Sequence, residues 1–134
     1  SQKLEVDRLK NAPSKRYSGS VAYAREKRAL MVLTEEWAKE WKDDGIVVNA
    51  MHPGWADTPG VQRSLPEFRT LTQSVLRSAK EGADTIVWLA VASEAGATSG
   101  HLFLDRKIKP THFAKKTQET PSERKKLLSF LARH

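Results

Sequence analysis

The sequence predicts an α/β fold that contains part of a doubly wound parallel sheet, and three observations support this prediction. A long helical pattern covers residues 21–43. An apolar strand pattern follows at residues 46–51, interrupted only by Asn49, as is typical of a parallel sheet covered on both faces. A second helical pattern at residues 79–92 leads to a short strand at 101–104, so that helices and strands alternate along the chain.

The helix at residues 21–43 follows a polar segment, residues 1–20, which we expect to be irregular and exposed. We expect Ser20 to cap the helix and Asp44-Gly45 to end it. One helical stripe joins residues at spacings of three and four, namely Tyr23, Lys27, Leu30, Thr34, Trp37 and Trp41.

The remaining elements are shorter. An amphipathic helix is expected at residues 66–78, ahead of the helix at 79–92, and a turn at 96–100 precedes the last strand. A basic stretch then leads to a short helix at residues 122–132, which we expect Ser122 to cap. Its early basic residues oppose the helix dipole, so this helix needs its leucines and Phe130 to pack against something.

A tyrosine and a lysine on the first helix are the candidate reactive groups. Tyr23 and Lys27 are four residues apart and therefore neighbours on one helical face. An ammonium close to a phenol favours the phenolate, and such a phenol can exchange a proton with a hydroxyl or carbonyl oxygen. Solvated helices often carry such a pair, but here the next strand runs into a His-Pro-Gly loop at residues 52–60. Ligands of doubly wound sheets bind at that end of the strands.

The Tyr23/Lys27 pair and the run NAMHPGWADTPGV at residues 49–61 together resemble the second half of a short-chain dehydrogenase/reductase. The resemblance implies the C-terminal portion of a Rossmann-like sheet whose N-terminal nucleotide-binding half is missing. It divides the chain into residues 1–110, the C-terminal half of such a domain, and residues 111–134, a basic extension.

The resemblance also implies roles for five residues. Tyr23 matches the catalytic acid/base, and Lys27 matches the lysine that promotes ionisation of that tyrosine and binds the nicotinamide ribose. Pro53 and Gly54 match the loop that lies against the nicotinamide, and Thr58 matches a residue that meets the carboxamide or phosphate edge of the cofactor. The implied cofactor is NAD or NADP, with most of its site upstream of this chain.

One family position departs from the pattern. The family's serine usually lies thirteen residues before the tyrosine, where this chain has Lys10. Residues 1–20 look like an insert, so the serine is expected upstream of the chain, or by residue type alone at Ser1, Ser14, Ser18 or Ser20. We interpret His52 and Asp57 as surface or hydrogen-bonded groups and not as a second acid/base pair.

Two absences predict that the chain is part of a longer protein. Its seven glycines include no closely spaced pair between a strand and a helix, as a phosphate-binding turn requires. Two strands alone also make a marginal sheet. We therefore expect a C-terminal fragment that is inactive when isolated.

Composition narrows the classes of function. The chain has no cysteine, which excludes disulfides and thiolate metal sites, and its histidines show no metal-ligand spacing. We expect no membrane-spanning segment and an intracellular, cytoplasmic protein. The whole formal charge of +7 lies in residues 106–134. A solvated helix is favoured over an anion-binding surface there, and nucleic-acid binding ranks last because no recognition motif accompanies the charge.

The resulting functional hypothesis is an oxidoreductase that transfers hydride between NAD(P) and a small apolar carbonyl compound or secondary alcohol, with Tyr23 as acid/base. The helix at residues 21–43 could pair two subunits, as it does in many relatives. The alternative is a non-catalytic binding or scaffold protein of the same fold, because the catalytic serine is missing from its usual position.

Overall fold

The computed structural model describes residues 2–10, 17–57, 76–112 and 114–133. In chain order its elements are the 3-10 turn η1 (Val6–Arg8), helix α1 (Gly19–Glu40), strand β1 (Ala50–Met51), helix α4 (Ala79–Val91), the 3-10 turn η2 (Ser93–Ala97), strands β2 (Leu102–Leu104) and β3 (Lys107–Lys109), the 3-10 turn η3 (Lys115–Thr117) and helix α5 (Pro121–Leu131).

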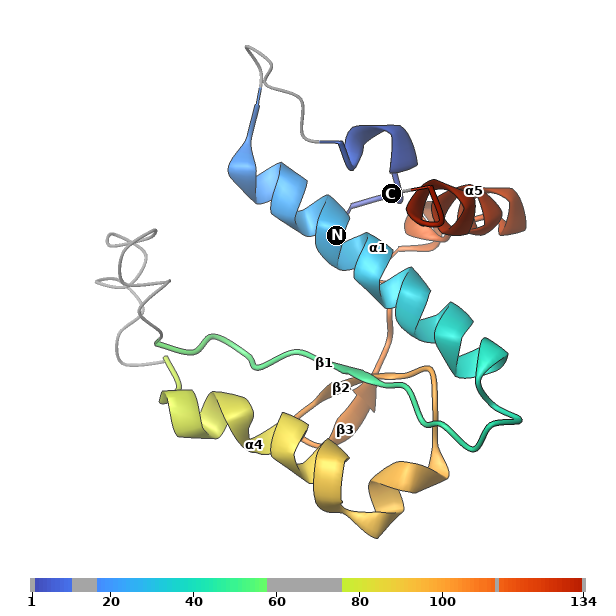
Figure 1. The fold of residues 1–134 in the computed structure, drawn as a ribbon. Helices are drawn as coiled ribbons and strands as arrows, with labels where there is room; N and C mark the ends of the chain where they lie inside the picture. The colour runs from blue at the N-terminus through green and yellow to red at the C-terminus, as the bar shows by residue number, and fades with distance from the viewer. Residues whose placement is uncertain (1, 11–16, 58–75, 113, 134) are drawn as a thin grey trace.

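A small mixed sheet with helices on both sides forms the lower part of the molecule (Figure 1). The strand order is β1-β2-β3, with β1 parallel to β2 and β3 antiparallel to β2. Helix α4 packs on one face through Trp88, whose ring lies 5.7 Å from that of Phe103. Helix α1 passes on the other side, where a side chain at Gly100 would lie 3.2 Å from Cβ of Ala38. The α/β class and the parallel pairing of the two predicted strands are confirmed.

Helix α1 has nearly the predicted extent but a different cap and a different buried face. Its N-cap is Ser18, which makes no capping hydrogen bond, so the predicted cap at Ser20 is wrong. Gly45 ends the following turn with φ of +72°, as expected of its position after the helix. The buried side of α1 consists of Ala22, Arg28, Ala29, Met31, Val32, Thr34 and Ala38. The predicted stripe is therefore exposed at its N-terminal end, while its two tryptophans stack on each other with centroids 5.4 Å apart.

The predicted strand at residues 46–51 is confirmed only for its last two residues. Ile46 is 49% exposed, and Val48 takes its hydrogen bonds from the turn after η2: its amide donates to Ser99 Oγ, and its carbonyl accepts from the Gly100 amide. The Asn49 side chain joins the same turn, donating to the Thr98 carbonyl and accepting from the His101 amide. The polar residue that interrupts the strand pattern thus fixes the strand to its neighbour.

Strand β3 was not predicted. It closes a two-residue hairpin with β2, in which Phe103 faces Ile108 and the turn residues Asp105 and Arg106 have φ of +54° and +58°. Two positive φ angles in a two-residue loop are typical of a type I′ turn, which usually carries Asn-Gly or Asp-Gly. Because Asp-Arg lacks the glycine, the turn gives no clear signal in the sequence.

Helix α4 confirms the prediction for residues 79–92, and Ser78 begins it with a capping box closed by Glu81. Its buried residues are Gly82 and Thr85, while Ile86 and Val87 are more than half exposed. Most of the helix predicted at residues 66–78 lies outside the described residues, and residues 76–78 are not helical.

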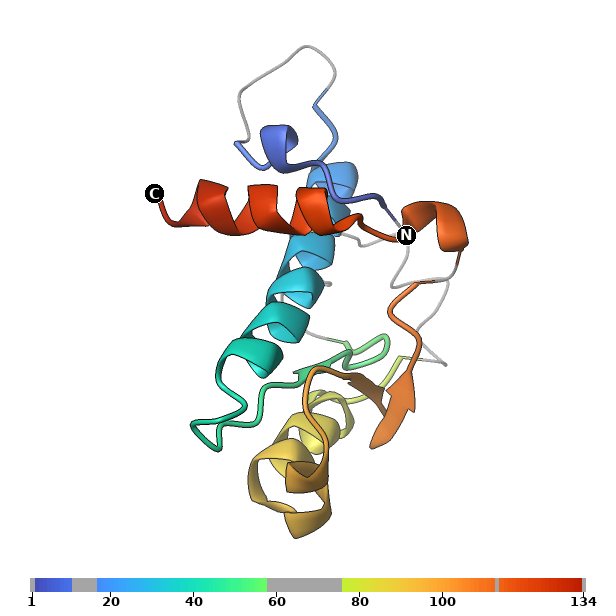
Figure 2. The same cartoon turned by 90° about the vertical axis from the view of Figure 1, so that its right-hand side faces the viewer.

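The N-terminal segment and the C-terminal helix share a core with α1. Two predictions for these segments, the exposure of residues 1–20 and the cap of the last helix, are wrong. Residues 1–20 are not simply exposed, because Leu4 and Val6 are buried together with Val32 of α1 and Leu127 of α5. Leu127 is fully buried, so α5 does depend on packing. Its cap is Thr120 and not Ser122, with a capping box to Glu123 and Pro121 at the first helical position. Figure 2 shows α5 crossing α1 beside η1.

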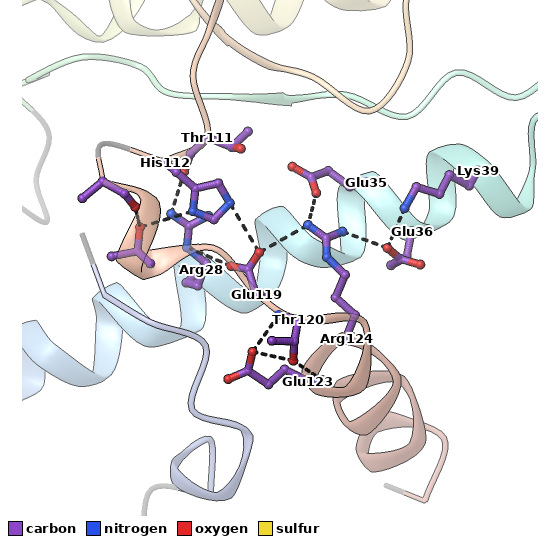
Figure 3. A network of polar contacts seen from close by, with 12 residues as sticks. Arg28, Glu35, Glu36, Lys39, Thr111, His112, Glu119, Thr120, Glu123 and Arg124 are labelled. Atoms are coloured by element: carbon purple, nitrogen blue, oxygen red, sulfur yellow. Dashed lines mark hydrogen bonds and ion pairs between the residues drawn. The ribbon is translucent and has the colours of Figure 1, made fainter.

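A buried polar network also ties the C-terminal segment to α1 (Figure 3). The side chain of Glu119 is 1% exposed and lies within 3.5 Å of the guanidinium of Arg28, which is itself buried on α1. His112 and Arg124 approach its other oxygen at 3.4 and 3.3 Å. Arg124 also binds Glu35 and Glu36, and although burial alone would lower the pKa of Arg124, its hydrogen bonds with Glu36 and Glu35 raise it.

Candidate functional site

The phenol and ammonium predicted to react lie together on the open face of α1. The Tyr23 side chain is 61% exposed, and Lys27 is exposed one turn further along the helix. The Lys27 ammonium lies over the Tyr23 ring, 5.4 Å from its centroid, within the range of a cation–π contact. The helix therefore holds the two side chains together on an exposed face.

The His-Pro-Gly loop leaves the carboxyl end of β1 in a fixed conformation. The His52 amide still donates to the Phe103 carbonyl of β2, at 2.8 Å. The His52 ring then turns back over the loop, where its Nδ1 accepts the Gly54 amide at 2.9 Å. Gly54 has φ of +74°, a region that costs other residues energy. His52 thus acts as a hydrogen-bonded group of the loop, in line with our interpretation.

Arg77 contacts this loop through its guanidinium and its backbone. No role for this residue was predicted from the sequence. A side chain at Gly54 would lie 2.9 Å from three atoms of the Arg77 guanidinium, so that group occupies the space that a glycine leaves free. The Arg77 backbone also pairs with the loop, donating to the Trp55 carbonyl and accepting from the Asp57 amide, both at 2.8 Å. The close approach at Gly54 is therefore made by a residue of the chain itself.

The Arg77 guanidinium is in turn fixed by the β2–β3 turn. It forms two parallel hydrogen bonds with the Asp105 carboxylate, at 2.5 and 2.9 Å. The hydrogen bond from Arg77 holds the pKa of Asp105 below its ordinary value, and Asp105 raises the pKa of Arg77. The adjacent Arg106 pairs in the same way with Asp84 of α4. Through these two ion pairs, the β2–β3 turn connects Arg77, which contacts the loop, to α4.

A glycine inside α4 lets that helix lie close to the loop. A side chain at Gly82 would lie 3.0 Å from Cβ of Ala56 and 3.6 Å from Cβ of Pro53. An isolated glycine inside a helical pattern often marks such a close approach. This was the one sequence signal that could have placed α4 against the loop, since nothing marks Arg77 or Asp105.

The predicted site residues therefore fall into two groups, each held by its own contacts. Tyr23 and Lys27 form the first on α1, and Pro53 and Gly54 belong to the second after β1. Thr58 lies outside the described residues, as do Ser1 and Ser14. Ser18 and Ser20 lie at the start of α1, where their hydroxyls are 3.1 Å apart.

We expect Gly54→Ala to destabilise the loop. A residue with a side chain pays roughly 1–2 kcal/mol for the left-handed conformation, and the new methyl group would push the Arg77 guanidinium away from Asp105. The free energy of unfolding of the full-length protein, measured with denaturant, should fall by at least about 1 kcal/mol.

Gly96→Ala is the matched control, because no atom lies within 4 Å of the position of its new methyl group and its φ is not positive. This variant should change the free energy of unfolding by less than about 1 kcal/mol. Equal effects of the two alanines would contradict the role given to Gly54.

The described residues lack two kinds of feature. No group of three or more histidine, cysteine or carboxylate side chains in the described ranges is arranged to hold a metal ion. Within the same ranges, no helix has the length and apolar character needed to cross a membrane.

Comparison with known proteins gives the class to which this fold and loop belong. The family model described as enoyl-(acyl carrier protein) reductase matches residues 11–106. Dehydrogenase/reductase SDR family member 12 of Bos taurus is 43% identical over 132 residues, and the protein of the same name from Homo sapiens is 42% identical over 132 residues. Each alignment covers 97% of this chain and 41% of the relative. Human retinol dehydrogenase 13 is 31% identical over 108 residues, covering 75% of this chain and 32% of the relative.

The chain belongs to the short-chain dehydrogenase/reductase family. It spans about two fifths of the length of the two relatives that match nearly all of it.

Proposed function

We propose that this chain supplies the catalytic pair of an NAD(P)-dependent oxidoreductase that interconverts a carbonyl group and a secondary alcohol. The observation that carries the proposal is the Tyr23–Lys27 pair, with the ammonium over the exposed phenol ring. Three named relatives are dehydrogenases or reductases, which supports the same class of reaction.

Tyr23 would act as the proton donor and acceptor. In carbonyl reduction its hydroxyl gives a proton to the oxygen as that atom becomes an alkoxide, and in alcohol oxidation its phenolate takes the proton back. Lys27 would hold a positive charge beside the reacting side chain, since its ammonium lies over the Tyr23 ring. The exposure of both side chains leaves room for a substrate on the outer face of α1.

We propose that these residues form part of a nicotinamide site. A bound NAD(P) would supply or accept the hydride. Lys27 offers an unburied ammonium for a ribose hydroxyl, and the exposed ring of Pro53 offers an apolar surface in the loop next to Gly54. Thr58 completes the proposed set. The rest of the cofactor site would belong to the remainder of a longer protein in which β1 joins a doubly wound parallel sheet.

Exposed apolar surface on this chain agrees with such a larger assembly. Ile46 and Val47 before β1 and Ile86, Val87 and Val91 on α4 are all about half exposed or more. We propose that the remainder of the protein, or a second subunit paired through α1, covers part of this surface. We further propose a small apolar carbonyl or alcohol as substrate, and a cytoplasmic location.

Lys27→Ala is expected to weaken cofactor binding and turnover together. The change removes the positive charge next to the phenol and the proposed hydrogen-bond donor to the cofactor ribose. We therefore expect cofactor affinity and turnover each to fall by about tenfold or more. Cofactor affinity can be measured by titration of the full-length protein, and turnover by oxidation of the reduced cofactor with a panel of apolar ketones.

Lys42→Ala is the control, because this exposed lysine follows the end of α1 and should affect neither quantity. A Lys27→Ala variant that matches the control would contradict the proposed role. The alternative function, a non-catalytic binding protein, is favoured by Lys10 at the usual serine position. It predicts cofactor binding by the wild-type protein without turnover of any ketone in the panel.

A further inference from the structure

A hollow of about 480 Å³ lies between η1 and α5, on the part of the molecule that carries the excess of positive charge. Both views show η1 beside α5 (Figures 1 and 2). The volume falls within the range of roughly 300–1,000 Å³ typical of small-molecule sites. The hollow is made by the segment that precedes α1 and by the C-terminal helix, and it contains none of the residues of the candidate site described above.

The walls of this hollow carry four cations and one carboxylate. The cations are Lys10, Lys125, Lys126 and Arg133, and the carboxylate is Asp7. Lys126 pairs with Asp7 at 2.6 Å. Among the described residues, no carboxylate forms an ion pair with Lys10, Lys125 or Arg133, so a net charge of +3 is left around one small space. Such a concentration of like charge attracts an anion.

The cations are not simply spread over a solvated helix. The Arg133 Nε atom donates to the Ser129 carbonyl at 3.2 Å, which holds its side chain back along α5. The Lys10 ammonium lies 5.7 Å from the centroid of the Phe130 ring. Arg124, in contrast, points to α1, where Glu35, Glu36 and Glu119 neutralise it. The basic residues of α5 thus divide into one that holds the fold and others that face the hollow.

The same hollow has an apolar side. Phe130 and Val6 line it, and both also belong to or pack against the core that joins α5 to α1. Ser122 and Ser129 add hydroxyl groups that can donate to an oxyanion. Lysine and arginine are the usual partners of phosphate oxygens.

From this combination we propose that the hollow between η1 and α5 binds an organic phosphate. The phosphate group would lie among Lys125, Arg133 and Lys10, and an apolar or aromatic part of the ligand would contact Phe130. The basic extension, residues 111–134, then contributes to an anion-binding surface as well as to the folded core. The ligand can be a soluble phosphate ester or the headgroup of a phospholipid, because both present the same chemistry.

The test uses phenyl phosphate, which combines a phosphate with an aromatic ring, in calorimetric titration of the full-length protein. We expect it to bind about tenfold more tightly than inorganic phosphate, because the ring adds apolar contact with Phe130. The double variant Lys125→Gln/Arg133→Gln should lose about tenfold or more in affinity, since two charge-assisted contacts are removed. Both residues are exposed, so folding should be preserved.

Lys42→Gln/Lys80→Gln is the matched control, because it removes the same charge from exposed positions on other elements. Sedimentation with phosphatidylcholine vesicles, with and without phosphatidic acid, separates the two sources of ligand. Vesicle binding that needs phosphatidic acid and is lost only in the Lys125/Arg133 variant supports a lipid headgroup. Titration with phenyl phosphate that shows the same selective loss, without vesicle binding, supports a soluble ester. Equal behaviour of the two double variants in both assays would overturn the proposal.

Discussion

Glu119→Gln should lower the free energy of unfolding by about 3–5 kcal/mol, the cost typical of removing one member of a buried ion pair. The Glu119 carboxylate is 1% exposed and faces Arg28, His112 and Arg124. Glutamine keeps the shape but removes the charge. The Arg28 guanidinium would then stay buried on α1, still hydrogen-bonded to the Thr111 carbonyl at 2.6 Å but without the negative charge of Glu119 beside it. Denaturant unfolding of the full-length protein measures the change.

Glu40→Gln is the control for this experiment, because Glu40 is exposed at the end of α1 and its change should cost less than about 0.5 kcal/mol. The double variant Arg28→Met/Glu119→Leu should recover part of the lost stability, because two apolar groups can replace a buried ion pair. A Glu119→Gln variant as stable as wild type would show that the network does not fasten the C-terminal segment to α1.

Because of the same network, deleting the basic extension is a poor test of whether its charge has a function. Removal of residues 111–134 would take away Leu127, which is fully buried in the core, together with Glu119 and Arg124. Loss of activity after such a deletion would therefore reflect unfolding and not a function of residues 111–134. Charge substitutions at exposed positions of α5 are therefore the appropriate experiment.

The largest effect on activity is expected for Tyr23→Phe. The change removes the transferable proton and keeps the ring beneath the Lys27 ammonium, so the packing of α1 should survive. Turnover should fall by a factor of about 10² to 10⁴, the usual contribution of a positioned acid. Cofactor affinity should change little, because phenylalanine leaves Lys27 and the loop intact. Steady-state kinetics and a cofactor titration on the full-length protein separate the two quantities.

Tyr17→Phe is a closely matched control. Tyr17 is the other tyrosine of the chain, it is 59% exposed, and it lies just before α1. The same hydroxyl is removed from a side chain of similar exposure, six residues away from Tyr23. A turnover deficit shared by both variants would indicate that the loss does not come from proton transfer by Tyr23.

Much of the fold could be predicted from the sequence, because hydrophobic periodicity is local. The helices near residues 21–43 and 79–92 and the strand at 101–104 are present within a few residues of their predicted bounds. Their caps were harder to place, since several hydroxyl residues stand side by side. Thr120 and Glu123 form a capping box around Pro121, a pattern that the sequence contains and that favours Thr120 over Ser122.

Which face of an element is buried could not be predicted in the same way, because it depends on distant parts of the chain. The stripe through Tyr23 and Lys27 is open, while Ala29 and Val32 meet Leu4 and Leu127 from the two ends of the chain. The reach of Arg77 to Gly54 and Asp105 is likewise a tertiary contact. The sequence did predict that Tyr23 and Lys27 lie together, since a spacing of four residues on a helix is enough to bring two side chains together.

The most direct test of the proposed function is the rate of hydride transfer in a single turnover of alcohol oxidation, measured with cofactor saturating. Wild type and Tyr17→Phe should transfer hydride at similar rates, because both keep the proposed proton acceptor. Tyr23→Phe should be slower by about 10² to 10⁴. A Tyr23→Phe variant that keeps the wild-type rate would contradict the assignment of Tyr23 as the acid/base.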